Sequence, residues 1–281
     1  MTRAEHRLFA LLASLALSLT VCASYAQTGS APKNQSRINI AGSALLEPMI
    51  SDMARRFETR RTGVHIEVRT DRSGNAIKAL RAGAVDIAMA SRPLLQTETD
   101  LFAFHVARDG VAVVVHRDNA VKGLDRQQLI DLLTGRIRDW KALGGKPGEV
   151  SLAWRSDGQG AVEFLLATLK LRREQIGPHV RVVDNRDALS AVSKRPNAVA
   201  LVSVGEAERA ASGGAPIKLL AYNDVPASTR NVQNRSYAIS RPLTLLTREL
   251  PSGVRKDFID FALSGEVTDL QVKYGFVPYQ E

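Results

Sequence analysis

The sequence predicts an α/β fold of two lobes, because strand-like and helix-like patterns alternate along the chain and the alternation restarts beyond His116. With 281 residues, the chain is long enough for two domains of ordinary size. Strands separated by helices favour parallel pairing. We therefore expect each lobe to hold a mostly parallel sheet flanked by helices.

The first half contains short apolar or alternating strands and helices with apolar residues three or four positions apart. Val64, Ile66 and Val68 alternate with polar residues, which predicts a half-buried strand with His65 toward solvent. The segment 111–115 is apolar throughout and is expected to be buried on both faces. The other predicted elements are a strand at Ile38 to Ala41, a helix with Leu46, Ile50, Met53 and Phe57, a helix with Ile77 and Leu80 that stops near Gly83, and a strand at Val85 to Met89.

In the second half, Asp125 and Gln128 match the capping-box pattern that begins a helix, and Gly135 is expected to end that helix. The C-terminal segment is expected to return to the first lobe. The other predicted elements are strands at Ser151 to Arg155, Val180 to Val183, Ala198 to Val204 and Ile217 to Tyr222, helices with Val162, Leu165, Leu166 and Leu169, from Asp187 to Lys194, and with Val254, Phe258 and Phe261, and a polar stretch from Asn223 to Arg235.

Three short Gly/Ser turns lie where a strand pattern gives way to a helix pattern. They are Gly42-Ser43, Ser73-Gly74 and Gly158-Gln159-Gly160. At such a turn, free backbone N–H groups and the positive end of the helix dipole can hold an anion. The three turns together predict one anion site.

The first 26 residues match a secretory signal. Arg3 and Arg7 precede an apolar run, and Ser24-Tyr25-Ala26 supplies the small residues that a signal peptidase accepts. The run is shorter than the roughly 20 apolar residues that a spanning helix needs. Cys22 offers an alternative as a lipoprotein cysteine, but Val21 is too large for the position before it. We expect cleavage after Ala26, followed by a disordered linker over residues 27–36.

Composition excludes several classes of function. Cleavage would remove two arginines and one glutamate, so the formal net charge would fall from +9 to +8, with the basic residues dispersed among acids. Only 5% of residues are aromatic, which leaves few stacking platforms for nucleic acid. The single cysteine lies in the signal, so disulfides and thiolate sites are excluded from the mature chain. An exported, cysteine-free, basic globule of this kind points to the periplasm.

Enzyme motifs are absent from the sequence. Gly144-Gly145-Lys146 lacks the spacing and the following hydroxyl of a phosphate-binding loop, and no Gly-x-Ser-x-Gly elbow occurs. The five histidines are scattered without metal-ligand spacing. We therefore expect no catalysis, no cofactor and no metal, although a Ser-His-Asp arrangement could still form through space.

Nearly the whole mature chain, from about Arg37 to the C-terminus, resembles a known protein family. The chain resembles the periplasmic phosphate-binding proteins that serve phosphate ABC transporters. The resemblance rests on short pieces in the family's order: Gly42-Ser43 with Pro48; Ser73-Gly74 with Ile77; Asp86-Ile87-Ala88-Met89-Ala90-Ser91-Arg92-Pro93; Arg108-Asp109-Gly110-Val111; Gly135 with Trp140, Leu143 and Gly144; Arg155 with Gly160 and Phe164; and Tyr237 with Arg241-Pro242-Leu243.

The resemblance implies the two-lobed periplasmic-binding-protein fold, with a hinge and a ligand held between the lobes. It implies that Ser73 and Arg155 contact the anion, and that Ser91 stands where some members carry a proton-accepting aspartate and others serine. Ser91-Arg92-Pro93 and Ser240-Arg241-Pro242 are interpreted as structural turns near the hinge. The implied ligand-binding residues are Ser43, Ala44, Leu45, Ser73, Gly74, Ser91, Arg155, Gln159, Gly160 and Ala161.

The chain departs from the family pattern at several of these positions. Ala44 and Leu45 stand where the family usually has a hydroxyl, and Gln159 and Ala161 replace a serine and a threonine. Each unpaired ligand oxygen in a closed cleft costs about 1 to 3 kcal/mol. We therefore expect weaker phosphate binding or a different ligand.

Taken together, the sequence predicts a monomeric periplasmic solute-binding protein that captures phosphate or a related oxyanion for an ABC permease. We expect this protein to bind no nucleic acid and not to insert stably into the membrane. The alternative is a divergent member that acts as an envelope sensor, adhesive or interaction protein. The expected boundaries are residues 37–115 and 236–281 for the first lobe and 116–235 for the second.

The signal predicts that the mature protein begins at Gln27. N-terminal sequencing or intact mass of the exported protein measures this directly. A product that begins at an acylated Cys22 would contradict the prediction.

Overall fold

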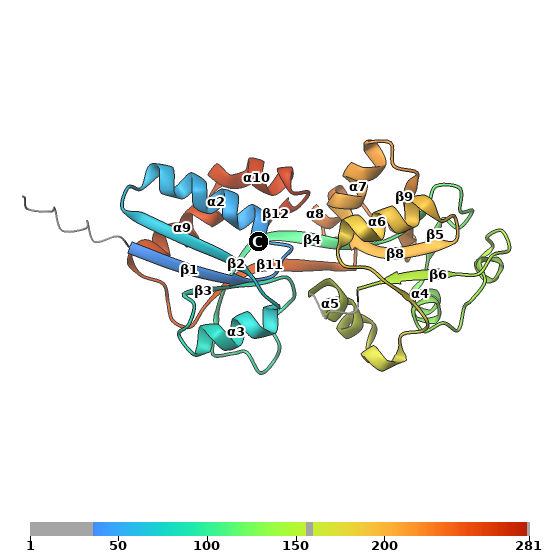
Figure 1. The fold of residues 1–281 in the computed structure, drawn as a ribbon, viewed down its shortest axis with the longest axis horizontal. Helices are drawn as coiled ribbons and strands as arrows, with labels where there is room; N and C mark the ends of the chain where they lie inside the picture. The colour runs from blue at the N-terminus through green and yellow to red at the C-terminus, as the bar shows by residue number, and fades with distance from the viewer. Residues whose placement is uncertain (1–35, 156–159, 280–281) are drawn as a thin grey trace, which may run out of the picture. The chain divides into compact units, whose positions relative to one another are not determined.

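Strands β4 (Phe102–His116) and β11 (Ser240–Thr247) lie at the centre of the sheet, with the other strands on either side (Figure 1). The computed structural model describes residues 36–155 and 160–279. The chain divides into the segment Met1–Ser36 and one compact unit, Arg37–Glu281. The expected signal peptide lies outside the described residues.

The remaining elements follow in chain order. The strands are β1 (Ser36–Gly42), β2 (Val64–Thr70), β3 (Ile87–Ala90), β5 (Gly123–Leu124), β6 (Ser151–Trp154), β7 (Val180–Arg181), β8 (Ala198–Ser203), β9 (Ile217–Leu219), β10 (Ala221–Tyr222) and β12 (Val277–Pro278). The α-helices are α2 (Glu47–Arg60), α3 (Ser73–Arg81), α4 (Arg126–Leu133), α5 (Gly160–Leu169), α6 (Asn185–Lys194), α7 (Val204–Ser212), α8 (Thr229–Gln233), α9 (Gly253–Leu263) and α10 (Thr268–Lys273). Short 3-10 helices cover Trp140–Leu143, Arg173–Gln175 and Gly265–Val267.

The sheet is parallel in its outer parts and antiparallel in the middle. Its strand order is β2-β1-β3-β11-β4-β8-β6-β7, and β9 and β12 also pair with β4. Parallel pairing joins β1 to β3 and joins β6 to both β7 and β8. Strand β11 pairs antiparallel with β3 and β4, and β4 pairs antiparallel with β8. The expected two-lobed α/β fold is present, and the antiparallel pairs arise because β4 and β11 run through its centre.

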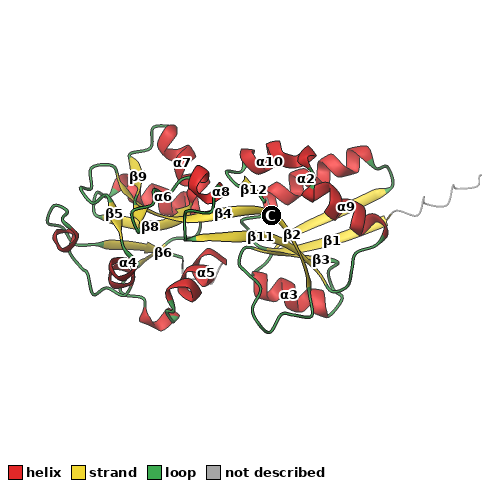
Figure 2. Ribbon diagram, turned by 180° about the vertical axis from the view of Figure 1, so that it is seen from behind, coloured by secondary structure: helices red, strands yellow, loops and turns green. Residues whose placement is uncertain are grey.

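Helices cover both faces of the sheet, as Figures 1 and 2 show. Beside β1 and β3, helices α2, α9 and α10 lie on one face and α3 on the other. Beside β8 and β6, α6 and α7 lie on one side and α4 and α5 on the other. Three hydrophobic clusters fill these layers, and the largest includes both tryptophans, Trp140 and Trp154. Double coverage explains why residues 111–115 of β4 are buried, as predicted.

Local signals in the sequence match the structure at several helix ends. The side chain of Asp125 accepts from the Gln128 N–H and the Gln128 side chain accepts from the Asp125 N–H, which confirms the capping box. Gly135 has φ +73° just beyond α4, as expected of a glycine that ends a helix. His65 is exposed, as predicted.

Other predicted elements were wrong or incomplete. The apolar run through Val204 was interpreted as strand, but β8 ends at Ser203 and α7 begins at Val204. Helix α8 lies inside the predicted polar stretch and is capped by Ser228. Strand β4 begins at Phe102, well before the apolar run. Strand β1 includes Ser36, the last residue of the expected linker.

Helix α2 is tied to the end of α10 by a carboxylate. Asp52 accepts hydrogen bonds from Lys273 Nζ and Tyr274 Oη, each at 2.7 Å, and pairs with Arg55. Hydrogen bonds from Lys273 and then Tyr274 lower the pKa of Asp52 from 3.8 to about 2. A lowered folded-state pKa stabilises the fold above the unfolded pKa, and this contribution is lost as the pH falls through about 4 to about 2.

We predict that Asp52→Asn lowers the free energy of unfolding by about 1 to 2 kcal/mol near neutral pH. The difference from the unmodified protein should shrink as the pH falls from about 4 to about 2, and it should vanish only below about 2, where Asp52 is protonated in both states. Urea unfolding across this range measures both effects. As a control, Asp260→Asn breaks the exposed pair with Lys256 and should change stability by less than about 0.5 kcal/mol. A pH-independent loss for Asp52→Asn would contradict the assignment.

Candidate functional site

The first Gly/Ser turn lies where β1 ends beside β3. Gly42 has φ +144°, and a Cβ built there would lie 2.2 Å from the Met89 carbonyl oxygen, so only glycine fits. The Ser43 N–H donates to the same carbonyl at 3.0 Å. This close approach fixes the direction in which the chain leaves β1 toward α2.

Two predicted site residues meet at this turn. Ser43 Oγ donates to Ser91 Oγ at 2.9 Å, and both residues are buried. The Leu45 N–H donates to Ser43 Oγ at 3.3 Å. Because two hydroxyls that share one mutual hydrogen bond keep one further proton, the pair retains an O–H that can be donated to a ligand.

The second turn places Ser73 at the first position of α3, with only 4% of the residue exposed. Ser73 Oγ has no hydrogen-bond partner among the described residues. A buried hydroxyl without a partner is unfavourable by about 1 to 3 kcal/mol. Arg72, which precedes the helix, provides no side-chain cap within the described part of the chain. The start of α3 therefore keeps donors that a ligand could satisfy.

Arg155 follows β6 directly and is half-buried. With Ala44 and Leu45 of the first turn, it lines a cavity of about 380 Å³. Residues from α2, β8, the start of α6, α7 and the C-terminal segment complete the lining: Pro48, Asp184, Asn185, Arg186, Ser203, Glu206, Arg209, Tyr274 and Phe276. The cavity thus brings residues on both sides of the central strands together.

The predicted residues do not all share one cavity. Gly74 lines a second cavity, of about 660 Å³, with parts of α3, α5 and the segment 92–98. Ser73 and Ser91 line neither of the two. Gln159 lies outside the described residues. Gly160 begins α5, and Ala161 follows it in the helix.

Three functional candidates were missed by sequence reasoning. Arg241 lies within β11 and not in a turn, which corrects the interpretation of Ser240-Arg241-Pro242. Its Nη2 and Nε donate to Asp109 Oδ2 at 2.8 and 3.2 Å, and its Nη1 donates to the Ser91 carbonyl at 3.0 Å. Ser203 Oγ donates to Asp109 Oδ1 at 2.6 Å. The available signal was a charged residue within each of two predicted apolar regions, Asp109 just before the run 111–115 and Arg241 just before Pro242-Leu243.

Asp109 is fully enclosed by this network. Burial raises its pKa, while the charge of Arg241 and the hydrogen bonds from Ser203 and Arg241 act in the opposite direction. Both carboxylate oxygens of Asp109 therefore have hydrogen-bond partners, as a buried charge requires.

A second buried ion pair lies beside Ser91. Arg92 donates through Nη1 and Nη2 to the two oxygens of Glu98, each at 2.8 Å, and the Leu95 N–H also donates to Glu98 at 2.8 Å. Burial raises the pKa of Glu98, but the hydrogen bonds from Arg92 and Leu95 outweigh burial, and the pKa is lowered. The pair holds the segment that follows the Ser91 turn.

The arrangement favours an anion over a cation. The two carboxylates at the rim of the 380 Å³ cavity are engaged by protein donors: Asp184 accepts from the Asp187 N–H, and Glu206 accepts from Asn185 Nδ2 at 2.7 Å. Within residues 36–155 and 160–279, no group of three or more His, Cys, Asp or Glu side chains could hold a metal ion. The hydroxyl of Ser203, the start of α6 and the guanidinium groups of Arg155, Arg186 and Arg209 also line this cavity.

Comparison with known proteins agrees with the fold. A family model described as the PBP superfamily domain matches residues 27–266. The phosphate-binding protein PstS of Bacillus subtilis is 22% identical over 251 residues, which cover 88% of this chain and 82% of that protein.

Two solved structures are similar over most of the chain. An ABC-type phosphate transport receptor from Vibrio cholerae has a TM-score of 0.78 and 26% identity, covering 87% of this chain and 100% of that one. A putative phosphate ABC transporter substrate-binding protein from Clostridium perfringens, solved with bound phosphate, has a TM-score of 0.76 and 29% identity over the same shares.

We predict that Ser73→Ala leaves the ligand-free protein as stable as before, or more stable by up to about 1 kcal/mol, because it removes an unpartnered buried hydroxyl. The same change should weaken binding of inorganic phosphate by about 1 to 2 kcal/mol. Urea unfolding and calorimetric titration measure the two effects.

Ser43→Ala is the matched comparison, because it removes a hydroxyl that has partners and should therefore lower stability by about 1 kcal/mol. If Ser73→Ala destabilises the protein and leaves phosphate affinity unchanged, Ser73 is a structural residue.

Proposed function

Because the chain belongs to the PBP superfamily, we propose that it captures phosphate or a related oxyanion between its two lobes and presents the closed form to an ABC permease. The observation that carries this proposal is the buried hydroxyl pair of Ser43 and Ser91, which lies where the parallel strands β1 and β3 end. Ligands of open α/β sheets bind at the carboxyl ends of strands. The phosphate-binding and phosphate-transport relatives, similar over nearly nine-tenths of this chain, support the choice of anion.

The proposed site uses neutral donors and one charge. The Ser43–Ser91 pair supplies an O–H, Ser73 supplies its hydroxyl, and the first turn of α3 at Gly74 supplies backbone N–H groups. Arg155 supplies positive charge and can contact two oxygens of the anion at once. Ala44, Leu45, Gln159, Gly160 and Ala161 contribute through the backbone or, for Gln159, through a side-chain amide.

Ser91 also affects the choice of ligand. A carboxylate at this position needs a proton on the anion, because two negative oxygens otherwise repel each other. A serine hydroxyl can donate to a fully ionised oxygen. We therefore propose that the site accepts sulfate or molybdate as well as phosphate.

The proposed cycle involves no covalent step and no cofactor, so the protein acts by binding alone. None of the helices in the described part of the chain is long and apolar enough to cross a membrane. The signal-like residues 1–26 support export to the periplasm, and we propose that the protein acts there as a monomer beside the permease. The proposed lobes are residues 37–115 with 236–281, and residues 116–235.

Calorimetric titration of the mature chain with phosphate, sulfate, molybdate and a phosphate ester tests the proposal. We expect saturable binding of at least one inorganic oxyanion with a stoichiometry of one. Absence of saturable binding by all four would contradict the proposal and would favour the envelope sensor, adhesive or interaction protein.

We predict that Arg155→Ala weakens anion binding by about 2 to 5 kcal/mol, because it removes the charged partner of a desolvated anion. This corresponds to at least about a thirtyfold loss of affinity. Calorimetric titration with the anion that binds the unmodified protein measures the change.

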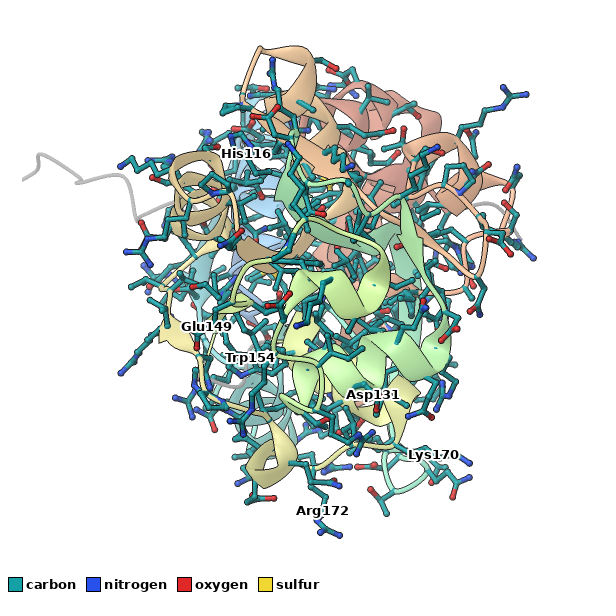
Figure 3. All side chains as sticks on the ribbon, turned by 90° about the vertical axis from the view of Figure 1, so that its right-hand side faces the viewer. His116, Asp131, Glu149, Trp154, Lys170 and Arg172 are labelled. Atoms are coloured by element: carbon teal, nitrogen blue, oxygen red, sulfur yellow. The ribbon has the colours of Figure 1, made fainter. Side chains whose placement is uncertain are left out.

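The matched control is Arg172→Ala, in which an exposed arginine of the same half is removed; Figure 3 shows Arg172 pointing away from the molecule, near Lys170. This control should bind the anion normally. Equal affinities for the two variants would place Arg155 outside the binding site.

A further inference from the structure

A continuous chain of hydrogen bonds crosses the centre of the sheet. Ser43 Oγ donates to Ser91 Oγ at 2.9 Å, the Ser91 carbonyl accepts from Arg241 Nη1 at 3.0 Å, and Arg241 donates to Asp109 at 2.8 Å. The other oxygen of Asp109 accepts from Ser203 Oγ at 2.6 Å. We call these five residues the relay. They come from the ends or interiors of β1, β3, β11, β4 and β8, which are far apart in sequence.

The middle of the relay is sealed from solvent. The side chain of Asp109 is 0% exposed and that of Arg241 is 2% exposed. Neither side chain lines a cavity beside the predicted site residues. Any effect of these two residues on ligand affinity must therefore pass through the residues that they hold.

The two ends of the relay are the two sides of the candidate site. At one end, Arg241 fixes the Ser91 carbonyl and so the turn that presents the Ser43–Ser91 hydroxyls. At the other end, Ser203 directly precedes α7 and lines the cavity that Arg155 also lines. Hydrogen bonds to charged groups in a dry interior are stronger and more directional than neutral ones. One charge pair therefore orients both sides.

We propose that Arg241 and Asp109 are positioning residues that hold the Ser43–Ser91 turn and the Ser203 end of β8 in a fixed relation, so that both sides of the anion site are preorganised. This proposal rests on the anion-binding function proposed above. It assigns a role in ligand affinity to two residues that do not contact the ligand. Preorganisation of this kind reduces the cost of ordering the site when the anion binds.

The first test is Asp109→Asn, which keeps the shape of the side chain but removes the charge that pairs with Arg241. We expect a folded protein whose affinity for inorganic phosphate is lower by at least about fivefold, because small misplacements of contact groups are costly. Tyr237→Phe is the control, since it removes a buried hydrogen bond to the Val111 carbonyl outside the relay. The control should lose stability and change affinity by less than about twofold. Unchanged affinity in a folded Asp109→Asn variant would overturn the proposal.

The second test does not depend on ligand binding or on the folding of Asp109→Asn. Ser43→Ala, Ser203→Ala and the double variant are unfolded with urea. If the relay couples its ends, the double variant should deviate from the product of the single effects by at least about threefold in the unfolding equilibrium constant. Ser43→Ala combined with Tyr237→Phe should show no such deviation.

The two tests separate the possible failures. If the unmodified protein binds no oxyanion, the proposed function is wrong, and the unfolding cycle still decides whether the relay couples its ends. If the effects of Ser43→Ala and Ser203→Ala on the unfolding equilibrium constant multiply to within about twofold in the double variant, the relay does not couple its ends. The positioning role is then wrong, whatever the phosphate affinity.

Discussion

Arg241 and Asp109 face each other across β11 and β4 at a point where neither side chain reaches water, and their Cα atoms are direct partners in the strand register. Burying two ions is unfavourable by several kcal/mol each, and loss of one partner leaves an uncompensated charge. A slip of one residue between the strands would move one member of the pair to the other face of the sheet. The pair therefore favours one register for β11 and β4 up to the shift in register that the two strands make between Leu243 and Thr244.

The same two strands also position two parts of the candidate site, the turn after β1 and the start of α7. Strand β11 also pairs with β3, where Leu245 lies opposite Met89, and Met89 provides the carbonyl that approaches Gly42. Strand β4 also pairs with β8, where Val111 lies opposite Ser203. The turn after β1 and the start of α7 are thus positioned by the same two central strands. Backbone pairing and one ion pair bring the parts of the candidate site together.

Polar groups near the candidate site differ in whether other protein groups satisfy their hydrogen bonds. Arg92 and Glu98 satisfy each other, and Asp109 is saturated by Arg241 and Ser203. Ser73, by contrast, is buried with an unpartnered hydroxyl within the described residues. In a stable interior such a group is unfavourable unless a ligand completes it. This contrast supports an anion site at the start of α3, while the alanines and glutamine in the other turns reduce the number of hydroxyl donors.

Local patterns in the sequence determined the elements that depend on local physics. The capping box at Asp125, the terminating Gly135 and the buried run at 111–115 follow from short-range hydrogen bonding and apolar spacing, and the structure confirms them. The turns with Ser43 and Ser73 could be located in the same way, whereas Ser91 was assigned only from the family resemblance. Helix α7 has an amphipathic sequence at helical spacing but was not predicted. The Arg241–Asp109 pair could not be predicted from local patterns, because the two residues are 132 positions apart in sequence and come together only when β11 and β4 pair. Burial makes separation of these two charges unfavourable, because either charge alone would be buried without a partner. That burial is a property of the tertiary structure alone.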